Sequence, residues 1–383
     1  MNTTKIKDVC VVVSGTTPKS TEKRYWNGTH VWITPAELTE DSFIVSDSER
    51  HITDEAVKAT GLKPFPKGTV LLSSRAPIGK VAIAGCDMYC NQGFKNLICS
   101  DSIYNLYLYY FLKSKTEYLN SLGRGATFKE ISKGIVEDIT IPFPAYDEQI
   151  HIAKQLQKIT ELIALKKRQY RYLDDIIRSR FIEMFGDSQS NPKGFPYKRI
   201  NEFAKCIAGA TPSTKRKEYW SNGIIPWMSS GEVNYKRIWE TEKRISQMGY
   251  DSCSTKMIPA HTVVIAMAGQ GRTRGTVAVA EIPLCTNQSL CSIITDGTVD
   301  TDYLFTYLQF QYNNLRNISN GSSGRGGLNI KLIGQFTVLV PPLAVQQKFS
   351  NFLKEIDKSK MAVQKSLDEL ETLKKSLMQT YFG

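Results

Sequence analysis

The sequence lacks the features that mark membrane proteins, secreted proteins and disulfide-stabilised scaffolds. No run approaches the roughly 18 uncharged apolar residues of a membrane helix, and residues 1–8 contain no apolar signal segment. The eight cysteines are dispersed without a Cys-x-x-Cys pair, a pattern that favours reduced, structural thiols. These absences predict a cytoplasmic protein.

Signatures of catalytic and metal sites are also missing. The sequence has no Gly-x-x-x-x-Gly-Lys-Ser/Thr loop, no His-Glu-x-x-His and no Gly-x-Ser-x-Gly. Its four histidines are scattered, and no Cys/His quartet has zinc spacing. Cys86 and Cys90 lie four residues apart without a second pair, so we interpret them as buried thiols. We therefore predict no catalytic residue and no metal site.

Positive charge is what the sequence has in excess. It contains 49 Lys and Arg against 37 Asp and Glu, a formal charge of +12. Residues 186–343 carry +6, and residues 1–146, 147–185 and 344–383 carry +2 each. A diffuse positive balance fits binding of a polyanion across folded surfaces, although many basic proteins bind no nucleic acid.

Two halves of the chain repeat the same short motifs in the same order. The pairs are Gly15–Pro18 with Gly209–Pro212, Tyr25–Trp26 with Tyr219–Trp220, Trp32 and Glu37 with Trp227 and Glu232, Gly79–Ala82 with Gly275–Ala278, and Asn91–Gln92 with Asn287–Gln288. Gln149, Phe185 and Gly186 recur 197 residues later as Gln346, Phe382 and Gly383. This period is too long for a solenoid and indicates two tandem units.

The first part of each repeat, residues 1–146 and 187–343, has a mixed pattern. Short β-like runs occur at residues 9–13, 69–72 and 80–83, and again at 262–265 and 276–279, between Gly, Pro and Asn signals. Apolar, aromatic-rich helical stretches follow near 103–120 and 301–316. We expect an α+β fold with a curled antiparallel sheet, in which the repeated tryptophans belong to the core.

The second part of each repeat, residues 147–186 and 344–383, predicts one long helix. Apolar and a few basic residues alternate at spacings of four and three throughout, which is the seam of a coiled coil. The seam positions are Ile152, Leu156, Ile159, Ile163, Lys166, Tyr170, Leu173, Ile177, Arg180 and Met184, then Phe349, Leu353, Ile356, Lys360, Val363, Leu367, Leu370, Lys374, Leu377 and Tyr381. We expect the two helices to pair antiparallel, although two independent amphipathic helices remain an alternative.

Four groups of loop residues could contact DNA, because both repeats place cationic or small polar side chains at matching points. The candidates are Lys19, Lys23, Arg24, Thr34, Ser74, Arg75, Lys80, Arg124 and Lys129 in the first repeat, and Lys215, Arg216, Lys217, Ser229, Gln270, Arg272, Arg274, Arg325 and Asn329 in the second. Arg can read guanine and Gln adenine in the major groove, while Lys holds phosphate.

These motifs together resemble the specificity (S) subunit of type I restriction–modification systems. The resemblance is carried by the Gly-x-Thr-Pro, Tyr-Trp and Asn-Gln motifs and by a Pro followed by Gln at each long helix, Pro144 with Gln149 and Pro342 with Gln346. It covers residues 1–383, and the twofold repetition is its most specific feature. The two repeats differ in the Ser73–Ile78 loop and its counterpart Ala268–Arg274, so we expect them to read different bases.

The resemblance implies two similar target recognition domains, 1–146 and 187–343, joined and separated by two long helices that form an antiparallel coiled coil. Each domain would read one half of a bipartite, asymmetric site in double-stranded DNA, and the helices would fix the gap and dock two methyltransferase (M) subunits. The chain itself would be non-catalytic and bind no cofactor. S-adenosylmethionine, ATP and Mg would be used only by partner subunits, which could include two restriction (R) subunits.

Two other interpretations stay open at the level of sequence. A stand-alone DNA-acting enzyme such as a nuclease is disfavoured, since neither repeat contains a clear metal-carboxylate cluster. A coiled-coil scaffold without DNA specificity would bind polyanions only weakly and without regard to sequence.

Overall fold

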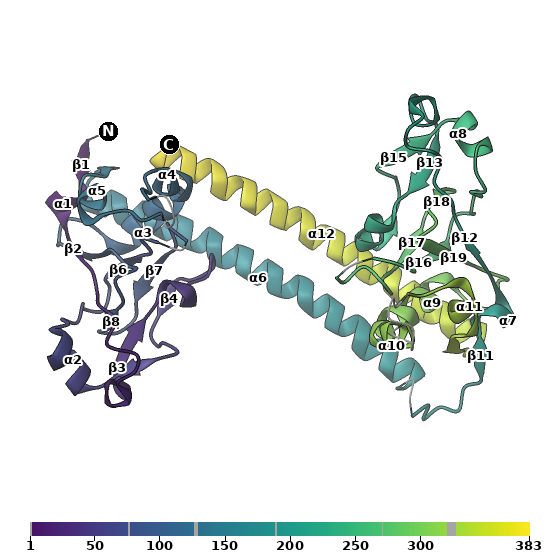
Figure 1. Cartoon of the computed structure of the whole chain (residues 1–383), viewed down its shortest axis with the longest axis horizontal. Coiled ribbons are helices and arrows are strands. Elements are labelled where there is room, and N and C mark those ends of the chain that lie inside the picture. Colours follow the sequence, from purple (N-terminus) through teal and green to yellow (C-terminus); the bar gives the residue numbers. More distant parts are fainter. Residues whose placement is uncertain (1, 76, 126–128, 188–189, 270, 320–326) are drawn as a thin grey trace. The chain divides into compact units, whose positions relative to one another are not determined.

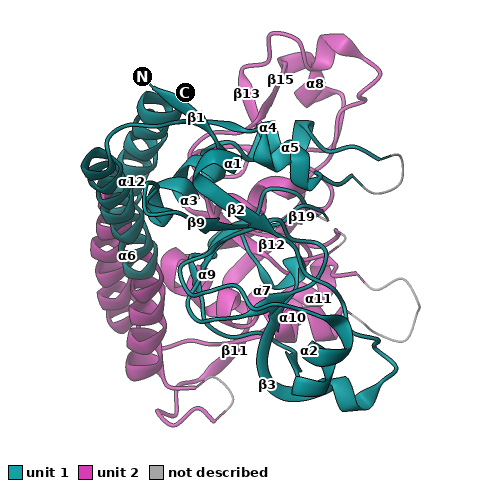
Figure 2. Ribbon diagram, turned by 90° about the vertical axis from the view of Figure 1, so that its left-hand side faces the viewer, with its two compact units in different colours: residues 1–169, 363–383 teal, residues 170–362 magenta. Residues whose placement is uncertain are grey.

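The computed structural model describes residues 2–75, 77–125, 129–187, 190–269, 271–319 and 327–383. The chain forms two compact units, unit 1 with residues 1–169 and 363–383 and unit 2 with residues 170–362 (Figure 2). Each unit combines a globular part with segments of both long helices (Figure 1). None of the helices in the described ranges is long and apolar enough to span a membrane.

Unit 1 contains the elements of the first repeat. They are β1 (Thr3–Lys5), α1 (Ile6–Val9), β2 (Cys10–Val13), η1 (Lys23–Tyr25), β3 (Trp26–Ile33), η2 (Pro35–Glu37), β4 (Ile44–Val45), β5 (His51–Ile52), α2 (Asp54–Thr60), β6 (Val70–Leu72), β7 (Val81–Ala84), β8 (Tyr89–Cys90), β9 (Asn96–Cys99), α3 (Asn105–Ser114), α4 (Thr116–Ser121), α5 (Lys133–Glu137), β10 (Thr140–Pro142) and the first part of α6 (Tyr146–Phe185).

The strands of unit 1 form three small sheets, with orders β2-β9-β6-β7-β4, β5-β3-β8 and β1-β10. Strand β1 pairs antiparallel with β10, so that Thr3 faces Pro142 just before α6 begins. The sheets are mixed, because β4 runs parallel to β7 and β8 runs parallel to β3. The predicted antiparallel sheet is therefore wrong at these strands, since alternation of apolar residues does not encode strand direction.

Unit 2 repeats this order with the elements of the second half. They are β11 (Tyr197–Arg199), α7 (Ile200–Phe203), β12 (Ala204–Ala208), η3 (Lys217–Tyr219), β13 (Ile225–Met228), η4 (Ser230–Tyr235), β14 (Arg237–Ile238), β15 (Lys243–Ile245), α8 (Gln247–Asp251), β16 (Thr262–Ala266), β17 (Val277–Ala280), β18 (Cys285–Thr286), β19 (Leu290–Thr295), α9 (Thr301–Phe310), α10 (Tyr312–Ile318), α11 (Ile330–Gln335), β20 (Thr337–Leu339) and the first part of α12 (Leu343–Phe382). Its sheets have the matching orders β12-β19-β16-β17-β14, β15-β13-β18 and β11-β20.

The main core of each unit lies between its larger sheet and a short buried helix. In unit 1 this helix is α3, where every residue from Leu106 to Leu112 is buried, as expected of a helix that is apolar all round. In unit 2 it is α9, with Tyr303 and Leu304 fully buried. Each predicted helical stretch is divided in two, with a break at Lys115 in unit 1 and at Gln311 in unit 2.

The two long helices pair antiparallel within each unit, which confirms the expected pairing. In unit 1, the Tyr381 hydroxyl near the end of α12 donates to Gln155 Oε1 near the start of α6, at 2.7 Å. In unit 2, Lys360 of α12 donates to Asp174 of α6. All twenty predicted seam residues are buried or half-buried, which is the burial expected of positions that face a partner helix.

The repeated Phe-Gly ends of the two helices have a packing explanation. Phe382, at the end of the second repeat, is buried in unit 1, with its ring centroid 5.3 Å from that of Tyr107. Phe185, at the end of the first repeat, is buried in unit 2, 4.7 Å from the ring of Tyr303. Helix α12 therefore ends in the core around the first repeat's globular part, and α6 ends in the core around the second repeat's globular part. This packing explains why the compact units do not follow the predicted boundaries at residues 146, 186 and 343.

Candidate nucleic-acid interface

In unit 1, the segment after β8 contacts three loops that carry predicted DNA-binding residues. We call residues 91–95 the Asn-Gln segment of unit 1. The Asn91 amide donates to the Ile33 carbonyl, at 3.2 Å, at the end of β3. The Thr17 hydroxyl donates to Gln92 Oε1 at 2.7 Å, and the amide of Ser74 donates to the carbonyl of Gly93 at 2.8 Å. One short segment thus fixes the loops after β2, β3 and β6.

Unit 2 uses its own Asn-Gln segment, residues 287–291, in the same way. The Asn287 amide donates to the Met228 carbonyl at 3.1 Å, and the Thr211 hydroxyl donates to Gln288 Oε1. The amide of Met267 donates to the carbonyl of Ser289 at 2.8 Å. The repeated Asn-Gln motif therefore has a structural role, which is to hold three loops of each unit at one place.

The Gly-x-Thr-Pro motif fits the first loop against the small sheet. A Cβ atom on Gly15 would lie 1.7 Å from the Cys90 carbonyl oxygen, and one on Gly209 would lie 1.8 Å from that of Thr286. Only glycine allows such a close backbone approach. The indole Nε1 of Trp32 donates to the Thr16 carbonyl at 3.1 Å, and Trp227 Nε1 does the same to Ala210 at 3.0 Å.

The repeated tryptophans form an edge-on pair in each unit, and a cation lies over each pair. Trp26 and Trp32 have ring centroids 5.2 Å apart, and the Arg50 guanidinium lies 3.4 Å from the centroid of Trp26. Trp220 and Trp227 are 5.0 Å apart, with the Lys243 ammonium 5.8 Å from Trp220. No local pattern in the sequence indicates these two cations, because Arg50 and Lys243 are separated along the chain from the tryptophans that they contact. The prediction of core tryptophans is confirmed for all but Trp220, which is half-buried.

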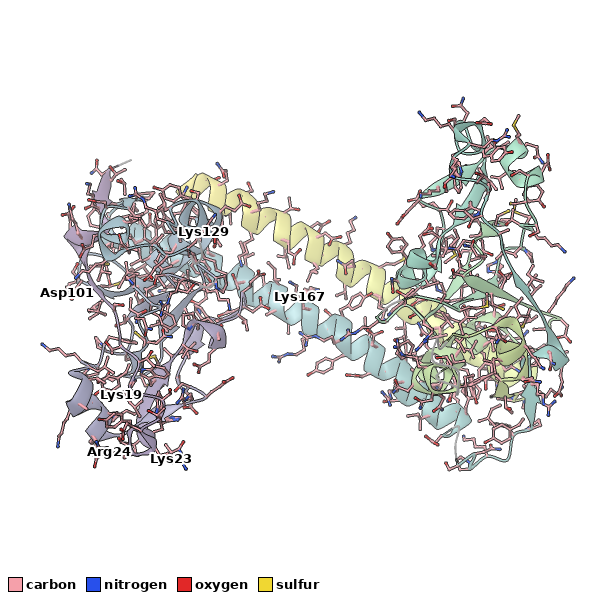
Figure 3. All side chains as sticks on the ribbon, viewed as in Figure 1. Lys19, Lys23, Arg24, Asp101, Lys129 and Lys167 are labelled. Carbon is pink, nitrogen blue, oxygen red and sulfur yellow. The ribbon has the colours of Figure 1, made fainter. Side chains whose placement is uncertain are left out.

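The structure places the predicted DNA-binding residues in three classes of exposure. The exposed ones are Lys19, Lys23, Arg24, Arg124, Lys129, Lys215, Arg216, Lys217, Arg272 and Asn329; the half-buried ones are Thr34, Arg75, Lys80, Ser229 and Arg274; Ser74 is buried. Gln270 and Arg325 lie outside the described residues. Lys19, Lys23 and Arg24 lie together at one end of unit 1, and Lys129 lies at its other end (Figure 3).

Five of these residues use their side chains to hold the loops themselves. Thr34 and Ser229 form capping boxes with Glu37 and Glu232, and Asn329 Oδ1 accepts from the amide of Leu332 at 2.9 Å. Their polar atoms therefore shape the loops, as helix N-caps commonly do.

The other two residues tie neighbouring loops together through long-range contacts. The Lys80 ammonium donates to the Pro35 carbonyl at 3.3 Å and to that of Leu38. The Ser74 hydroxyl accepts from Lys95 Nζ at 3.4 Å. A DNA-binding role for these side chains stays a prediction.

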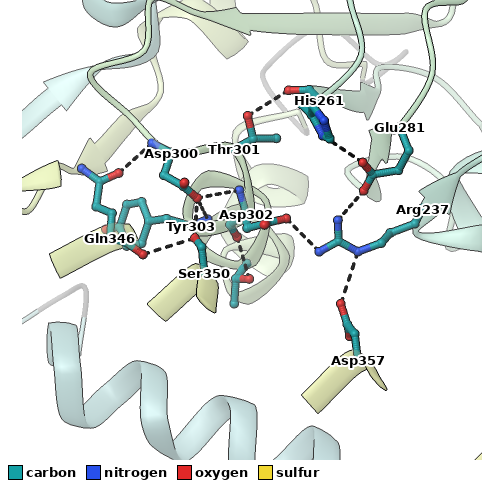
Figure 4. A network of polar contacts seen from close by, with 11 residues as sticks. Arg237, His261, Glu281, Asp300, Thr301, Asp302, Tyr303, Gln346, Ser350 and Asp357 are labelled. Atoms are coloured by element: carbon teal, nitrogen blue, oxygen red, sulfur yellow. Dashed lines mark hydrogen bonds and ion pairs between the residues drawn. The ribbon is translucent and has the colours of Figure 1, made fainter. Parts of the chain in front are cut away.

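A matched glutamine attaches each globular part to its long helix. Gln149 of α6 is fully buried, accepts from the Tyr104 amide at 2.9 Å and donates to the Ser102 and Pro144 carbonyls at 3.2 and 3.0 Å. Gln346 of α12 accepts from the Asp300 amide at 2.8 Å (Figure 4). These bonds explain why a glutamine follows the proline at the start of both helices.

Unit 2 adds an ion network between its sheet, α9 and α12 (Figure 4). Arg237 of β14 donates to Glu281 and, at 2.7 Å, to Asp302, and its Nε lies 3.4 Å from Asp357 of α12. His261 Nδ1 lies 3.0 Å from the other oxygen of Glu281. Burial raises the pKa of the Asp357 carboxyl, against the opposing effect of Arg237.

The described side chains offer no built metal centre. Among the residues in the described ranges, no three His, Cys, Asp or Glu side chains are grouped so as to hold a metal ion. The eight cysteines are free thiols. Cys90 is buried, as predicted, and burial raises the pKa of its thiol to about 12, whereas Cys86 is only half-buried.

Comparison with known proteins agrees with this architecture over the whole chain. The family described as "Type I restriction modification DNA specificity domain" matches residues 1–173 and 192–372. The MjaIX type I restriction enzyme specificity subunit of Methanocaldococcus jannaschii is 30% identical over 394 residues, covering 98% of this chain and 90% of the relative.

Solved structures show the same fold at low sequence identity. The S subunit of a type I restriction–modification system from M. genitalium is 16% identical, with a TM-score of 0.64 over 100% of this chain and 96% of that one. A chain from a study of type I system assembly and conformational transition has the same TM-score and identity, and 97% of it is covered. The chain, with two α+β recognition domains and two long helices, belongs to the family of type I restriction–modification DNA specificity subunits.

Proposed function

We propose that each globular part of this specificity subunit reads one half of a bipartite, asymmetric site in double-stranded DNA. The observation that carries the proposal is that the two Asn-Gln segments gather equivalent loops in both units, while the side chains on those loops differ. A shared scaffold with different exposed side chains is what two readers of two different half-sites require, because base contacts set specificity.

The long helices would fix the gap between the half-sites and dock two methyltransferase subunits. Exposed apolar side chains on these helices support docking: Leu165 in unit 1 is 57% exposed, and Tyr172 and Met361 in unit 2 are 57% and 74% exposed. In unit 2, a groove of about 740 Å³ is lined by Tyr172, Ile176 and Phe352. Exposed apolar surface of this kind on a helix pair is typical of a site where a partner helix docks.

The chain would act without catalysis of its own. Methylation of adenine would use S-adenosylmethionine on the methyltransferase subunits, and cleavage would require ATP and Mg²⁺ on two restriction subunits where these are present. Flipping of the target base would likewise be carried out by the methyltransferase, which must enclose that base.

The test is to express the chain with its methyltransferase subunits and to map the methylated adenines. We expect one split recognition sequence. Exchange of residues 187–343 for another recognition domain should change one half of the site, and insertion of one heptad into both helices should lengthen only the gap. A change in both halves, or in neither, would contradict the proposal, as would Mg²⁺-dependent DNA cleavage by the purified chain alone.

A further inference from the structure

A buried cation in unit 1 joins two of the predicted DNA-binding loops to the Asn-Gln segment. The side chain of Lys95, at the end of the Asn-Gln segment, is only 10% exposed. Its Nζ donates to Glu130 Oε1 at 3.1 Å, to the Ser74 hydroxyl at 3.4 Å and to the Gln92 carbonyl at 3.5 Å. A lysine this buried is retained only with such partners, since an unpaired buried charge is costly.

Glu130 in turn holds two arginines that are candidates for DNA contact. Its Oε2 lies 3.9 Å from Arg75 Nη1. Its backbone amide and carbonyl exchange hydrogen bonds of 2.9 and 3.0 Å with Arg124, and the Ile131 amide donates to the Ser74 carbonyl at 3.0 Å. The Arg75 guanidinium therefore lies beside a carboxylate that Lys95 holds in place, whereas Arg124 is held by the backbone of Glu130.

The second repeat has apolar residues at the positions that correspond to Ser74, Lys95 and Ile131. The Leu328 amide donates to the Met267 carbonyl as Ile131 does to Ser74, so Met267 occupies the position of Ser74 and Gly327 that of Glu130. The pairing of Val70 with Leu97 and of Val263 with Ile293 places Cys291 at the position of Lys95. Met267, Cys291 and Leu328 all belong to the hydrophobic core of unit 2.

Unit 2 forms the equivalent backbone bond without an ion pair at these positions. The fold therefore does not itself require the Lys95–Glu130 ion pair. Replacing a buried ion pair by apolar groups is often neutral or stabilising. The polar version differs in one functional respect, because it aims a carboxylate at Arg75. A fixed carboxylate 3.9 Å away favours one placement of the Arg75 guanidinium by charge attraction, and bidentate base recognition depends on where the guanidinium lies.

We propose that Lys95 and Glu130 are positioning residues of the first recognition domain, whose ion pair orients Arg75 for reading the half-site of unit 1. This inference rests on the proposed function. Glu130 acts through Arg75 and does not itself touch DNA, because a carboxylate beside phosphate would repel it.

The test uses the full complex with its methyltransferase subunits and duplexes that carry the mapped site with single-base changes in each half. Discrimination is the ratio of methylation rates on the native and the altered duplex. Glu130→Gln should lower discrimination about tenfold at one or more positions of the half read by unit 1, the size of one bidentate base contact. Discrimination in the other half should change less than about twofold, since those contacts are independent.

A double variant separates positioning from stability. Glu130→Gln alone leaves Lys95 buried without its carboxylate, so this variant should also melt at a lower temperature. Lys95→Met with Glu130→Gln removes both charges and should recover the melting temperature while discrimination stays low. Lys95→Arg should retain discrimination, and Glu117→Gln, at an exposed carboxylate of the same unit, should match the native chain.

The outcomes distinguish this inference from the proposed function. A complex that methylates no split site would overturn both. A split site that the double variant reads with native discrimination in both halves would overturn the positioning role alone. An equal loss in the two halves would also overturn it, because the ion pair belongs to unit 1 only.

Discussion

Replacing Gln149 by leucine should show how strongly the globular part of unit 1 is attached to its long helix. Leucine has nearly the volume of glutamine but cannot bond the Tyr104 amide or the Ser102 and Pro144 carbonyls. Each of these three partly buried groups costs about 1–3 kcal/mol when it is left unsatisfied. Burial of the apolar leucine side chain returns about 1.5–3 kcal/mol. We expect a net loss of about 3 kcal/mol in the free energy of unfolding of unit 1.

The assay is urea denaturation followed by far-ultraviolet circular dichroism, together with hydrogen exchange to locate the change. The Tyr104 amide should lose protection in Gln149→Leu, and the Asp300 amide should lose it in the matched Gln346→Leu variant. Gln169→Leu, at an exposed position of α6, should change stability by less than about 0.5 kcal/mol. A loss below about 1 kcal/mol for Gln149→Leu, or equal loss of protection in both units, would refute the reasoning.

Two further predictions concern the loops and the ion network. Gly15→Ala and Gly209→Ala should each lower the unfolding free energy by about 2 kcal/mol or more, because the new methyl group meets a backbone carbonyl. Gly231→Ala, with no neighbour closer than 4.0 Å, should be nearly neutral, and equal effects at all three glycines in urea titrations would contradict this account. For Asp357, burial raises the pKa in the folded chain, so the native protein is more stable with this carboxyl protonated and loses that stability as pH rises through the folded pKa. The urea midpoint of Asp357→Asn relative to the native chain should therefore increase as pH rises above about 4, the ordinary pKa of an aspartate; a difference that is constant or falls with pH would contradict it.

Local patterns in the sequence were enough to predict the repeat, the α+β class and the paired helices. Heptad spacing is a local property, and a seam such as Ile152 to Met184 favours burial against a similar seam. The antiparallel pairing follows because Phe382 packs in unit 1 and Phe185 packs in unit 2. The directions of β4 and β8 could not be predicted, because side-chain alternation is the same in parallel and antiparallel strands.

The candidate site was only partly predictable, because contacts between residues far apart in the sequence leave no local pattern. Cationic loops can be recognised one at a time, but the sequence does not show that Lys80 bonds the carbonyl of Pro35 or that Arg50 stacks on Trp26. No local pattern in the sequence singles out Lys95 or Glu130. Internal comparison of the two repeats was the available signal, since Lys95 corresponds to Cys291 and Glu130 corresponds to Gly327.

The sequence by itself determined that the protein is a duplicated unit of a mixed domain and a long helix, because periodicity, prolines and glycines act over a few residues. Only the tertiary structure decided which loops meet at the Asn-Gln segments and which charges are buried there. Those contacts join residues tens of positions apart, such as Lys95 and Glu130, and hydrogen-bond geometry and desolvation exist only once the chain has folded.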